Sequence, residues 1–268
     1  PDQSSAASDV YKRQQYNIFK NLFEKIMERK YKVLVFGATG FTGKLCAKYL
    51  KENYPDLSWA IAGRNEDKLK QVKMELDLDC DMLIADANNY EELRDIAKTT
   101  KVLLTTAGPY AKYGSLLMKA CVFENTHYVD ITGENHWVKK QMDLYHEEAV
   151  ARGVRIIPSC GYDSLPSDLG TLFAINKMNK AVKKVEVFHS AFGGASGGTI
   201  ESIFTMGRLP KEMRDPFLLN PKGSVSELQR ESGKDSIKIK WIDEAKKWSG
   251  LGLFAVANTR VVRRSAAL

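Results

Sequence analysis

The chain has 268 residues, which exceeds the usual size of a single domain and fits one complete domain plus part of another. Its 40 basic and 33 acidic residues give a net charge of +7, but no recognition helix, zinc-ligand spacing or aromatic RNA-binding pattern accompanies the charge, so we expect no nucleic-acid partner. The four cysteines are far apart and no histidine has a partner at metal-ligand spacing, which indicates no disulfide, no metal site and a reducing, cytoplasmic compartment.

The first segment of the chain divides into two parts. Residues 1–14, PDQSSAASDVYKRQ, resemble translated sequencing-adapter sequence, and we treat them as non-native. Residues 15–30 place Tyr16, Phe19 and Phe23 at helical spacing, which predicts an amphipathic helix. Its apolar face either packs on its own domain, the interpretation that we favour, or lies on a membrane surface.

A strand that runs directly into a glycine-rich turn follows. Residues 33–36 form the continuous apolar run of a strand buried on both faces of a parallel sheet. Gly37 permits a tight turn, Gly40 lets backbone approach a pyrophosphate, and Gly43 lets a helix that begins at Phe41 pack closely on the strand. Such a turn can join any strand to any helix, but strand, spacing and helix together predict a dinucleotide site at the helix N-terminus.

The second strand, 58–62, narrows the cofactor to NADP. It ends in Gly63-Arg64-Asn65, at the position where a dinucleotide-binding fold reads the adenosine ribose. An acidic residue there would accept from the 2′-hydroxyl of NAD, whereas Arg64 can pair with the 2′-phosphate of NADP. The alternative is a solvated arginine that opens the next helix.

Strands and helices alternate over the rest of the first domain. Further strands are predicted at 81–85, 101–106, 127–132 and 154–158, with helices at 41–53, 65–76, 89–100, 112–124 and 134–152. This order predicts an α/β fold, a Rossmann-type doubly wound parallel sheet over residues 31–181. Its ligand is expected outside the carboxyl ends of the strands.

Residues 182–268 are predicted to form an incomplete α+β second domain. A helix at 168–178 leads into it, and strands are expected at 182–188, 236–242 and 251–257, with a long loop at 207–235. Residues 177–268 carry 17 basic and 9 acidic residues, against 23 and 24 in residues 1–176. The excess suggests an anionic neighbour, such as a phospholipid surface, coenzyme A or an acidic carrier protein; solvated lysines explain it equally well.

Several motifs in this order resemble the saccharopine dehydrogenase-like oxidoreductases, including the trans-acting enoyl reductases of lipid biosynthesis. The motifs are FGATGFTGKL at 36–45, WAIAGRN at 59–65, TTAGPYAKYG at 105–114, YVDITGE at 128–134, CGYDSLPSDLG at 160–170, SGGTIES at 196–202 and ANTRVVRRSAAL at 257–268. Members of the family continue past the last motif, so the chain resembles a C-terminally truncated member, and in eukaryotic relatives the missing region holds a membrane-associating stretch.

The resemblance implies a set of cofactor-binding residues. Thr39, Gly40, Phe41 and Thr42, with Gly37 and Gly43, would surround the pyrophosphate, Arg64 would bind the 2′-phosphate and Asp86 would flank the adenine. Gly108 and Pro109 would lie by the ribose on the nicotinamide side, and Asp130 and Gly133 would border the nicotinamide.

Candidates for a catalytic proton donor come from the same strand ends. The Tyr-x-x-x-Lys pair of short-chain dehydrogenases occurs only at Tyr16 and Lys20, ahead of the first strand. Tyr110 follows Gly108-Pro109, so its hydroxyl could reach a substrate enolate, or its ring could instead pack over the cofactor. Asp163 is the second candidate, although capping of a helix that begins near Pro166 explains it better.

Three residues are predicted to line the substrate pocket. They are Tyr162 and, in the second domain, Ser196 and Thr199. A helix N-cap explains Ser196 and Thr199 as well as a pocket does.

The leading hypothesis is an NADPH-dependent oxidoreductase that reduces a lipid-like or carrier-bound enoyl or acyl substrate. The partners considered are this substrate, a membrane or lipid-droplet surface, where the protein would be peripheral, and a second copy in a homodimer. The alternative is a non-catalytic dinucleotide-binding protein at a lipid-droplet or membrane surface, favoured by the misplaced Tyr-x-x-x-Lys pair. An amino-acid dehydrogenase would need residues that grip a dicarboxylate, and nothing in the sequence singles those out.

Overall fold

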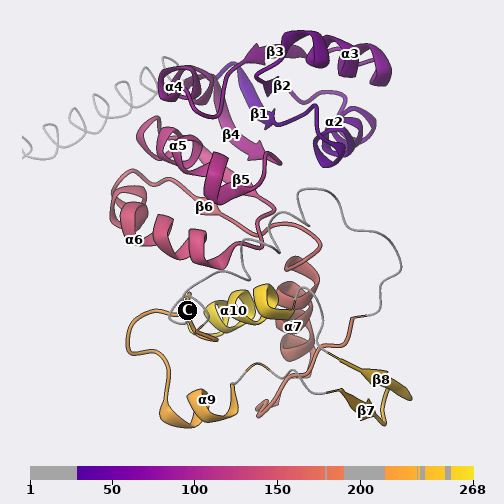
Figure 1. Cartoon of the computed structure of the whole chain (residues 1–268), viewed down its shortest axis with the longest axis vertical. Helices are drawn as coiled ribbons and strands as arrows, with labels where there is room; N and C mark the ends of the chain where they lie inside the picture. Colours follow the sequence, from indigo (N-terminus) through magenta and orange to yellow (C-terminus); the bar gives the residue numbers. More distant parts are fainter. Residues whose placement is uncertain (1–28, 179, 190–214, 234, 236–238, 251–254) are drawn as a thin grey trace, which may run out of the picture.

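A computed structural model describes residues 29–178, 180–189, 215–233, 235, 239–250 and 255–268. The two predicted N-terminal segments therefore lie outside the described residues except for Arg29 and Lys30, and so do Ser196 and Thr199. Figure 1 shows a sheet with helices on both faces, and below it a group of helices and a hairpin from the last third of the chain.

The sheet contains six parallel strands in the order β3-β2-β1-β4-β5-β6, which confirms the predicted doubly wound fold. The strands are β1 (Tyr31–Phe36), β2 (Trp59–Gly63), β3 (Asp81–Ile84), β4 (Thr100–Thr105), β5 (His127–Asp130) and β6 (Ile156–Ile157). The order reverses at β1, where Leu34 pairs with Ala60 of β2 on one side and with Leu103 of β4 on the other. The carboxyl ends of β1 and β4 therefore meet at the point where such sheets bind their ligands.

Helices cover the sheet in two groups, as Figure 1 shows. The helices are α2 (Phe41–Asn53), α3 (Glu66–Leu76), α4 (Tyr90–Thr99), α5 (Tyr110–Phe123) and α6 (Asn135–Ala151). Val35 and Ile61 pack with apolar residues of α2 and α3 on one face. Leu34, Leu103 and Tyr128 pack with residues of α4, α5 and α6 on the other. Alternate residues of the central strands thus pack into two separate cores, one on each face of the sheet. Both faces are buried, so the sequence of each central strand is a continuous apolar run.

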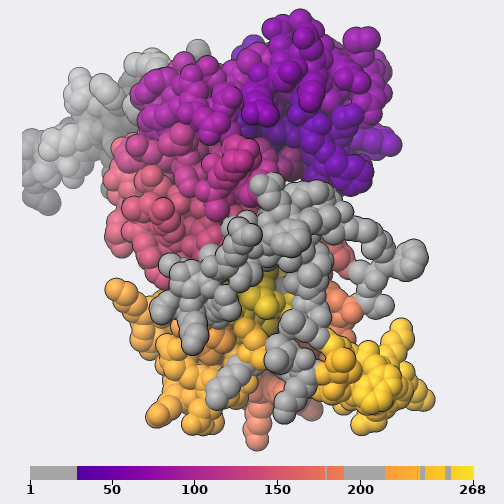
Figure 2. Space-filling model, viewed as in Figure 1, coloured from indigo at the N-terminus to yellow at the C-terminus, as the bar shows by residue number. Residues whose placement is uncertain are grey.

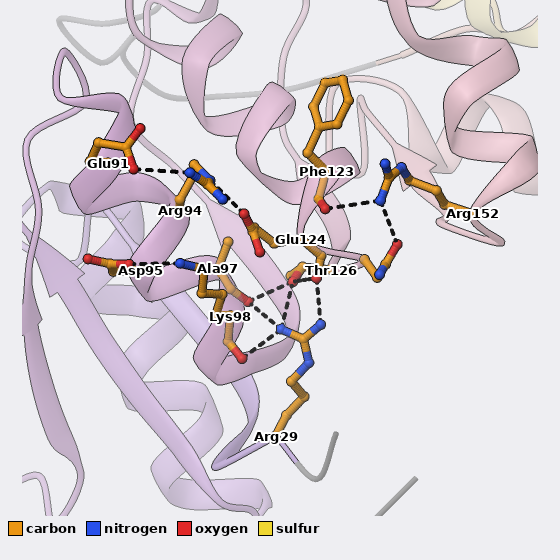
Figure 3. A network of polar contacts seen from close by, with 11 residues as sticks. Arg29, Glu91, Arg94, Asp95, Ala97, Lys98, Phe123, Glu124, Thr126 and Arg152 are labelled. Carbon is orange, nitrogen blue, oxygen red and sulfur yellow. Dashed lines mark hydrogen bonds and ion pairs between the residues drawn. The ribbon is translucent and has the colours of Figure 1, made fainter. Parts of the chain in front are cut away.

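Arg29 ties the amino-terminal end of the described chain to two helices (Figure 3). Its guanidinium donates to the carbonyl oxygens of Ala97 and Lys98, at distances of 3.0 and 2.6 Å, in the last turn of α4. The same group donates to the carbonyl oxygen of Glu124, directly after α5. One cation therefore satisfies terminal carbonyls of two helices, whose dipoles favour positive charge at that end.

The last third of the chain departs from several predictions. Its elements are α7 (Leu165–Met178), α9 (Glu227–Ser232), the antiparallel strands β7 (Lys240–Ile242) and β8 (Lys247–Ser249), and α10 (Ala255–Ser265). The predicted strand at 182–188 is wrong, because this exposed segment has no strand partner among the described residues. The strand predicted at 251–257 is also wrong over its described part, since Ala255–Ala257 begin α10; residues 251–254 lie outside the described residues.

The predicted loop at 207–235 contains the short helix α9, which the sequence reading missed. Ser226 starts it with a capping box, in which the Ser226 hydroxyl accepts from Gln229 N–H and the Gln229 side chain accepts from Ser226 N–H. In the sequence, a serine followed three residues later by a glutamine is the pattern that indicates this helix start.

Three arginines of α10 bind described residues of the segment 215–235, which precedes the hairpin. Arg260 is only 2% exposed, and its guanidinium pairs with the Asp235 carboxylate at 2.8 Å. Arg263 donates to the carbonyl oxygen of Pro216, and Arg264 to that of Leu219. Part of the basic excess in the last third of the chain is therefore engaged inside the protein. Figure 2 shows these C-terminal parts, orange to yellow, below the sheet.

Candidate cofactor-binding site

The turn between β1 and α2 has the shape that the glycine pattern predicted. Gly37 has φ +85°, a conformation that side chains disfavour. A Cβ on Gly43 would lie 2.3 Å from the carbonyl oxygen of Gly37, so only glycine allows the helix to approach the turn this closely. Gly40 is the exposed N-cap residue of α2. Strand, turn and helix start therefore leave space for an anionic group over Gly40.

The N-terminus of α2 differs from those of the next two helices. Asn65 caps α3 and Asn89 caps α4, and both helices carry acidic residues in the first turn. The α2 helix has no side-chain cap and no acidic residue in its first turn. Among the described residues, no side chain caps its terminal N–H groups, and such an N-terminus is suited to bind a phosphate.

Arg64 lies at the position where a residue that binds the 2′-phosphate of NADP is expected. It is exposed directly after β2, and its guanidinium makes no hydrogen bond or ion pair with another described residue. The neighbouring Asn65 is engaged, because its Oδ1 accepts from Lys68 N–H at 2.9 Å. Asp86, after β3, uses one carboxylate oxygen to accept from the backbone and side chain of Asn88. Arg64 is thus a cation at this end of the sheet without a hydrogen-bond or ion-pair partner among the described residues.

Glu134 joins the two loops that are expected to flank the nicotinamide. It is 1% exposed, and its carboxylate accepts from Tyr110 N–H at 2.8 Å and Ala111 N–H at 2.9 Å. These donors begin α5, which has no side-chain cap of its own and no acidic residue in its first turn. Glu134 therefore caps α5 from the β5–α6 loop and fixes Gly108-Pro109 relative to Gly133. Glu134 follows a predicted strand in the sequence, but no local pattern predicts that it caps α5.

Asp130 is buried, and its carboxylate points into the protein. It accepts from the Tyr128 hydroxyl at 2.8 Å and from Thr132 N–H and Ser159 N–H, both at 2.9 Å. Burial raises the pKa of Asp130 to about 6, although these hydrogen bonds act in the opposite direction. The side chain holds the ends of β5 and β6 together, so any contact with the nicotinamide would come from the backbone here and at Gly133.

Tyr110 also turns inward. The residue is 6% exposed, its hydroxyl donates to the carbonyl oxygen of Thr105 at 3.1 Å, and its ring centroid lies 5.7 Å from that of Trp137. Burial raises the pKa of this phenol. The ring thus packs on Trp137 inside the protein, and both a catalytic role for Tyr110 and its packing over the cofactor stay predictions.

The turn before α7 presents the other candidates. Tyr162 is exposed, and Asp163 is half-buried with a pKa that burial raises. The Asp163 carboxylate accepts no hydrogen bond from another described residue, so the predicted helix cap is not seen within the described chain. Asp163 therefore stays a candidate proton donor.

A polar cluster that the sequence reading missed joins α7 to α10. Ser167 Oγ and His189 Nε2 lie 2.8 Å apart, and Asn258 Nδ2 donates to the same hydroxyl at 3.2 Å. Asn135 Nδ2 donates to the carbonyl oxygen of Ala257 at 3.1 Å. These contacts place the start of α10 beside the β5–α6 loop. They link residues more than 20 positions apart, and no local spacing signals them.

Two kinds of feature are absent from the described residues. They contain no group of three His, Cys, Asp or Glu side chains arranged to hold a metal ion. Every helix in the described part of the chain is too short or too polar to cross a membrane.

Comparisons with known proteins agree on the type of domain. Residues 33–157 match the family model described as saccharopine dehydrogenase NADP binding domain. A Mycobacterium tuberculosis protein of the trans-acting enoyl reductase group is 36% identical over 258 residues, which cover 90% of this chain and 62% of that protein. The trans-acting enoyl reductase of Mycobacterium leprae is 34% identical over 264 residues, with the same coverage. The chain thus spans less than two thirds of these relatives.

Among solved structures, the apo saccharopine dehydrogenase (L-Glu forming) of Saccharomyces cerevisiae aligns with a TM-score of 0.47 and 18% identity, over 55% of this chain and 31% of that one.

Proposed function

We propose that this chain belongs to the saccharopine dehydrogenase-like family, whose NADP binding domain model matches residues 33–157, and that the whole protein is an NADPH-dependent enoyl reductase. The observation that carries the proposal is the pair of features at the carboxyl ends of β1 and β2: an uncapped α2 N-terminus over Gly40, and an exposed Arg64 with no described partner. The names of the relatives support enoyl reduction and hence an acyl substrate, and a lipid-like or carrier-bound chain is part of the proposal.

The residues present fit the dinucleotide. The Gly37–Gly43 turn and the α2 N-terminus would hold the pyrophosphate, and Arg64 would pair with the 2′-phosphate. When bound, the nicotinamide supplies a hydride to the β-carbon of the enoyl group, a proton adds at the α-carbon, and the products are NADP⁺ and a saturated acyl group. Glu134 holds the two loops beside that ring, and Asp163 is the candidate that carries the proton.

Cofactor binding is tested by titrating NADPH and NADH against the protein and following tryptophan fluorescence. We expect NADPH to bind more tightly than NADH, and Arg64→Ala to remove most of that difference. Arg155→Ala is the matched control, because Arg155 is an exposed arginine ahead of β6, on the edge opposite the predicted site. Equal binding of both cofactors by the unaltered protein would overturn the assignment of Arg64.

Turnover is tested by NADPH consumption with enoyl thioesters of increasing chain length. Asp163→Asn should lower kcat and leave NADPH affinity unchanged if Asp163 delivers the proton. Tyr110→Phe should have a small effect on kcat, since its hydroxyl bonds to Thr105. A large loss of kcat in Tyr110→Phe with a normal fold would reverse these roles.

A role in lipid metabolism, attachment to a lipid-droplet or membrane surface, and a homodimer belong to the same proposal. The basic excess after residue 176 supports an anionic surface or carrier. Co-sedimentation with anionic and neutral vesicles tests the surface, and light scattering tests the dimer. Binding to neither vesicle would remove the surface from the proposal.

A further inference from the structure

A cavity of about 350 Å³ lies between the sheet domain and the C-terminal helices. Figure 1 shows α6 above α10, and these two helices face each other across it. The cavity is beside β6, three strands from the phosphate-binding turn at β1. Apolar side chains form much of its wall, among them Met118, Met142, Ile156 and Val261. A cavity of this size and lining is typical of a small-molecule site.

Three polar side chains of the wall are already paired inside the protein. Ser159 Oγ donates to the carbonyl oxygen of Thr132 at 2.8 Å, and Ser265 Oγ donates to Asp168 at 3.0 Å. Arg264 donates to the carbonyl oxygen of Leu219 at 2.7 Å. These groups do not require a polar ligand, whereas Gln141, Tyr145 and His146 add further polar atoms to the wall, and Gln141 Oε1 has no hydrogen-bond partner among the described residues. The rest of the wall is aliphatic and thioether. Such a wall favours an apolar occupant, and its two methionines adapt to flexible chains.

The cavity adjoins the predicted nicotinamide end of the site. Ser159 forms part of its wall, and Ser159 N–H donates to Asp130 at the end of β5. The Thr132 carbonyl that accepts from Ser159 lies one residue before Gly133. One wall of the cavity is therefore hydrogen-bonded to the loop that would border the reacting end of the cofactor.

Resting on the proposed function, we propose that this cavity binds the hydrocarbon chain of the acyl substrate. A methylene group occupies about the volume of a water molecule, roughly 30 Å³, so the cavity holds on the order of ten carbon atoms. Chains of medium length fill it, and the reacting end of the substrate extends past Ser159 toward Gly133.

Direct binding of a fluorescent polyunsaturated fatty acid, displaced by decanoic acid, tests the cavity without relying on turnover. Met142→Trp fills it from α6 and Val261→Trp fills it from α10. Both should weaken probe binding at least tenfold while NADPH affinity stays unchanged. Leu144→Trp is the matched control, because Leu144 is an exposed residue of α6 outside the cavity wall, and it should bind like the unaltered protein.

The outcomes separate the cavity from the proposed function. If either filling variant folds normally and binds the probe as tightly as Leu144→Trp, or if the unaltered protein does not bind it, the cavity proposal is overturned. If the probe binds as expected but no enoyl thioester is reduced, the cavity proposal stands and the proposed function fails. If thioesters are reduced, the filling variants should shift the preference toward shorter chains, and an unchanged preference would also overturn the cavity proposal.

Discussion

Removal of the Glu134 carboxylate should destabilise the protein and loosen the cofactor site together. Glu134 accepts two backbone N–H groups at the start of α5, at 2.8 and 2.9 Å, from a position that is 1% exposed. Glu134→Ala leaves both donors without this acceptor, and Glu134→Gln retains one oxygen but directs an amide N–H₂ at the other donor.

The size of the effect follows from these contacts. A hydrogen bond to a charged group contributes about 1.5–3 kcal/mol, and a carboxylate at a helix N-terminus adds up to about 1 kcal/mol through the dipole. Because the two bonds share one carboxylate, we expect a loss of about 4 kcal/mol in the free energy of unfolding for Glu134→Ala and about 2 kcal/mol for Glu134→Gln. Typical domains have only about 5–15 kcal/mol of stability, so the loss is large.

Urea unfolding measures this loss, because a lower midpoint with an unchanged m-value reports stability alone. Glu147→Gln is the control. Glu147 is exposed on α6, the helix that begins directly after Glu134, so this substitution should change the midpoint little. NADPH affinity should fall in the Glu134 variants, because the loops at Gly108 and Gly133 lose their connection. A loss below about 1 kcal/mol for Glu134→Ala would refute the view that this carboxylate is what caps α5.

Three further predictions concern other contacts. Arg29→Lys should cost about 1–2 kcal/mol and lower Tm in thermal unfolding, because one ammonium cannot span the ends of α4 and α5; an unchanged Tm would contradict the double cap. Gly43→Ala should lower Tm and abolish NADPH binding, because its Cβ would lie 2.3 Å from the Gly37 oxygen, whereas Gly170→Ala, with no atom within 4 Å of the added Cβ, should do neither. Asp130, with a pKa of about 6 when folded and about 3.9 when unfolded, binds more protons in the folded state, so stability should fall by about 3 kcal/mol as pH rises from about 4 to about 6 and then stay level. Asp130→Asn should flatten that profile in urea unfolding at a series of pH values, and a profile equal to that of the unaltered protein would show that another group carries it.

The sheet and the first part of the candidate cofactor site could be predicted from local sequence patterns. Parallel strands buried on both faces appear as short apolar runs, and residues 33–36 and 101–106 show this pattern without any tertiary information. The turn glycines are equally local, because Gly37 adopts positive φ and Gly43 packs within six residues of it. Arg64 follows from its place after the second strand. The fold class and the part of the candidate cofactor site that would bind the phosphates could therefore be predicted from the sequence.

The other end of the candidate site depends on contacts between residues that are far apart in the sequence. Glu134 caps a helix that starts 24 residues earlier, and Asp130 and Tyr110 face inward because Ser159 and Thr105 provide their partners. Residues 182–188 alternate like a strand, but a strand forms only where another can complete its hydrogen bonds. Local patterns encode which backbone conformation a segment favours, whereas burial and pairing of polar groups depend on which distant segments the fold brings together.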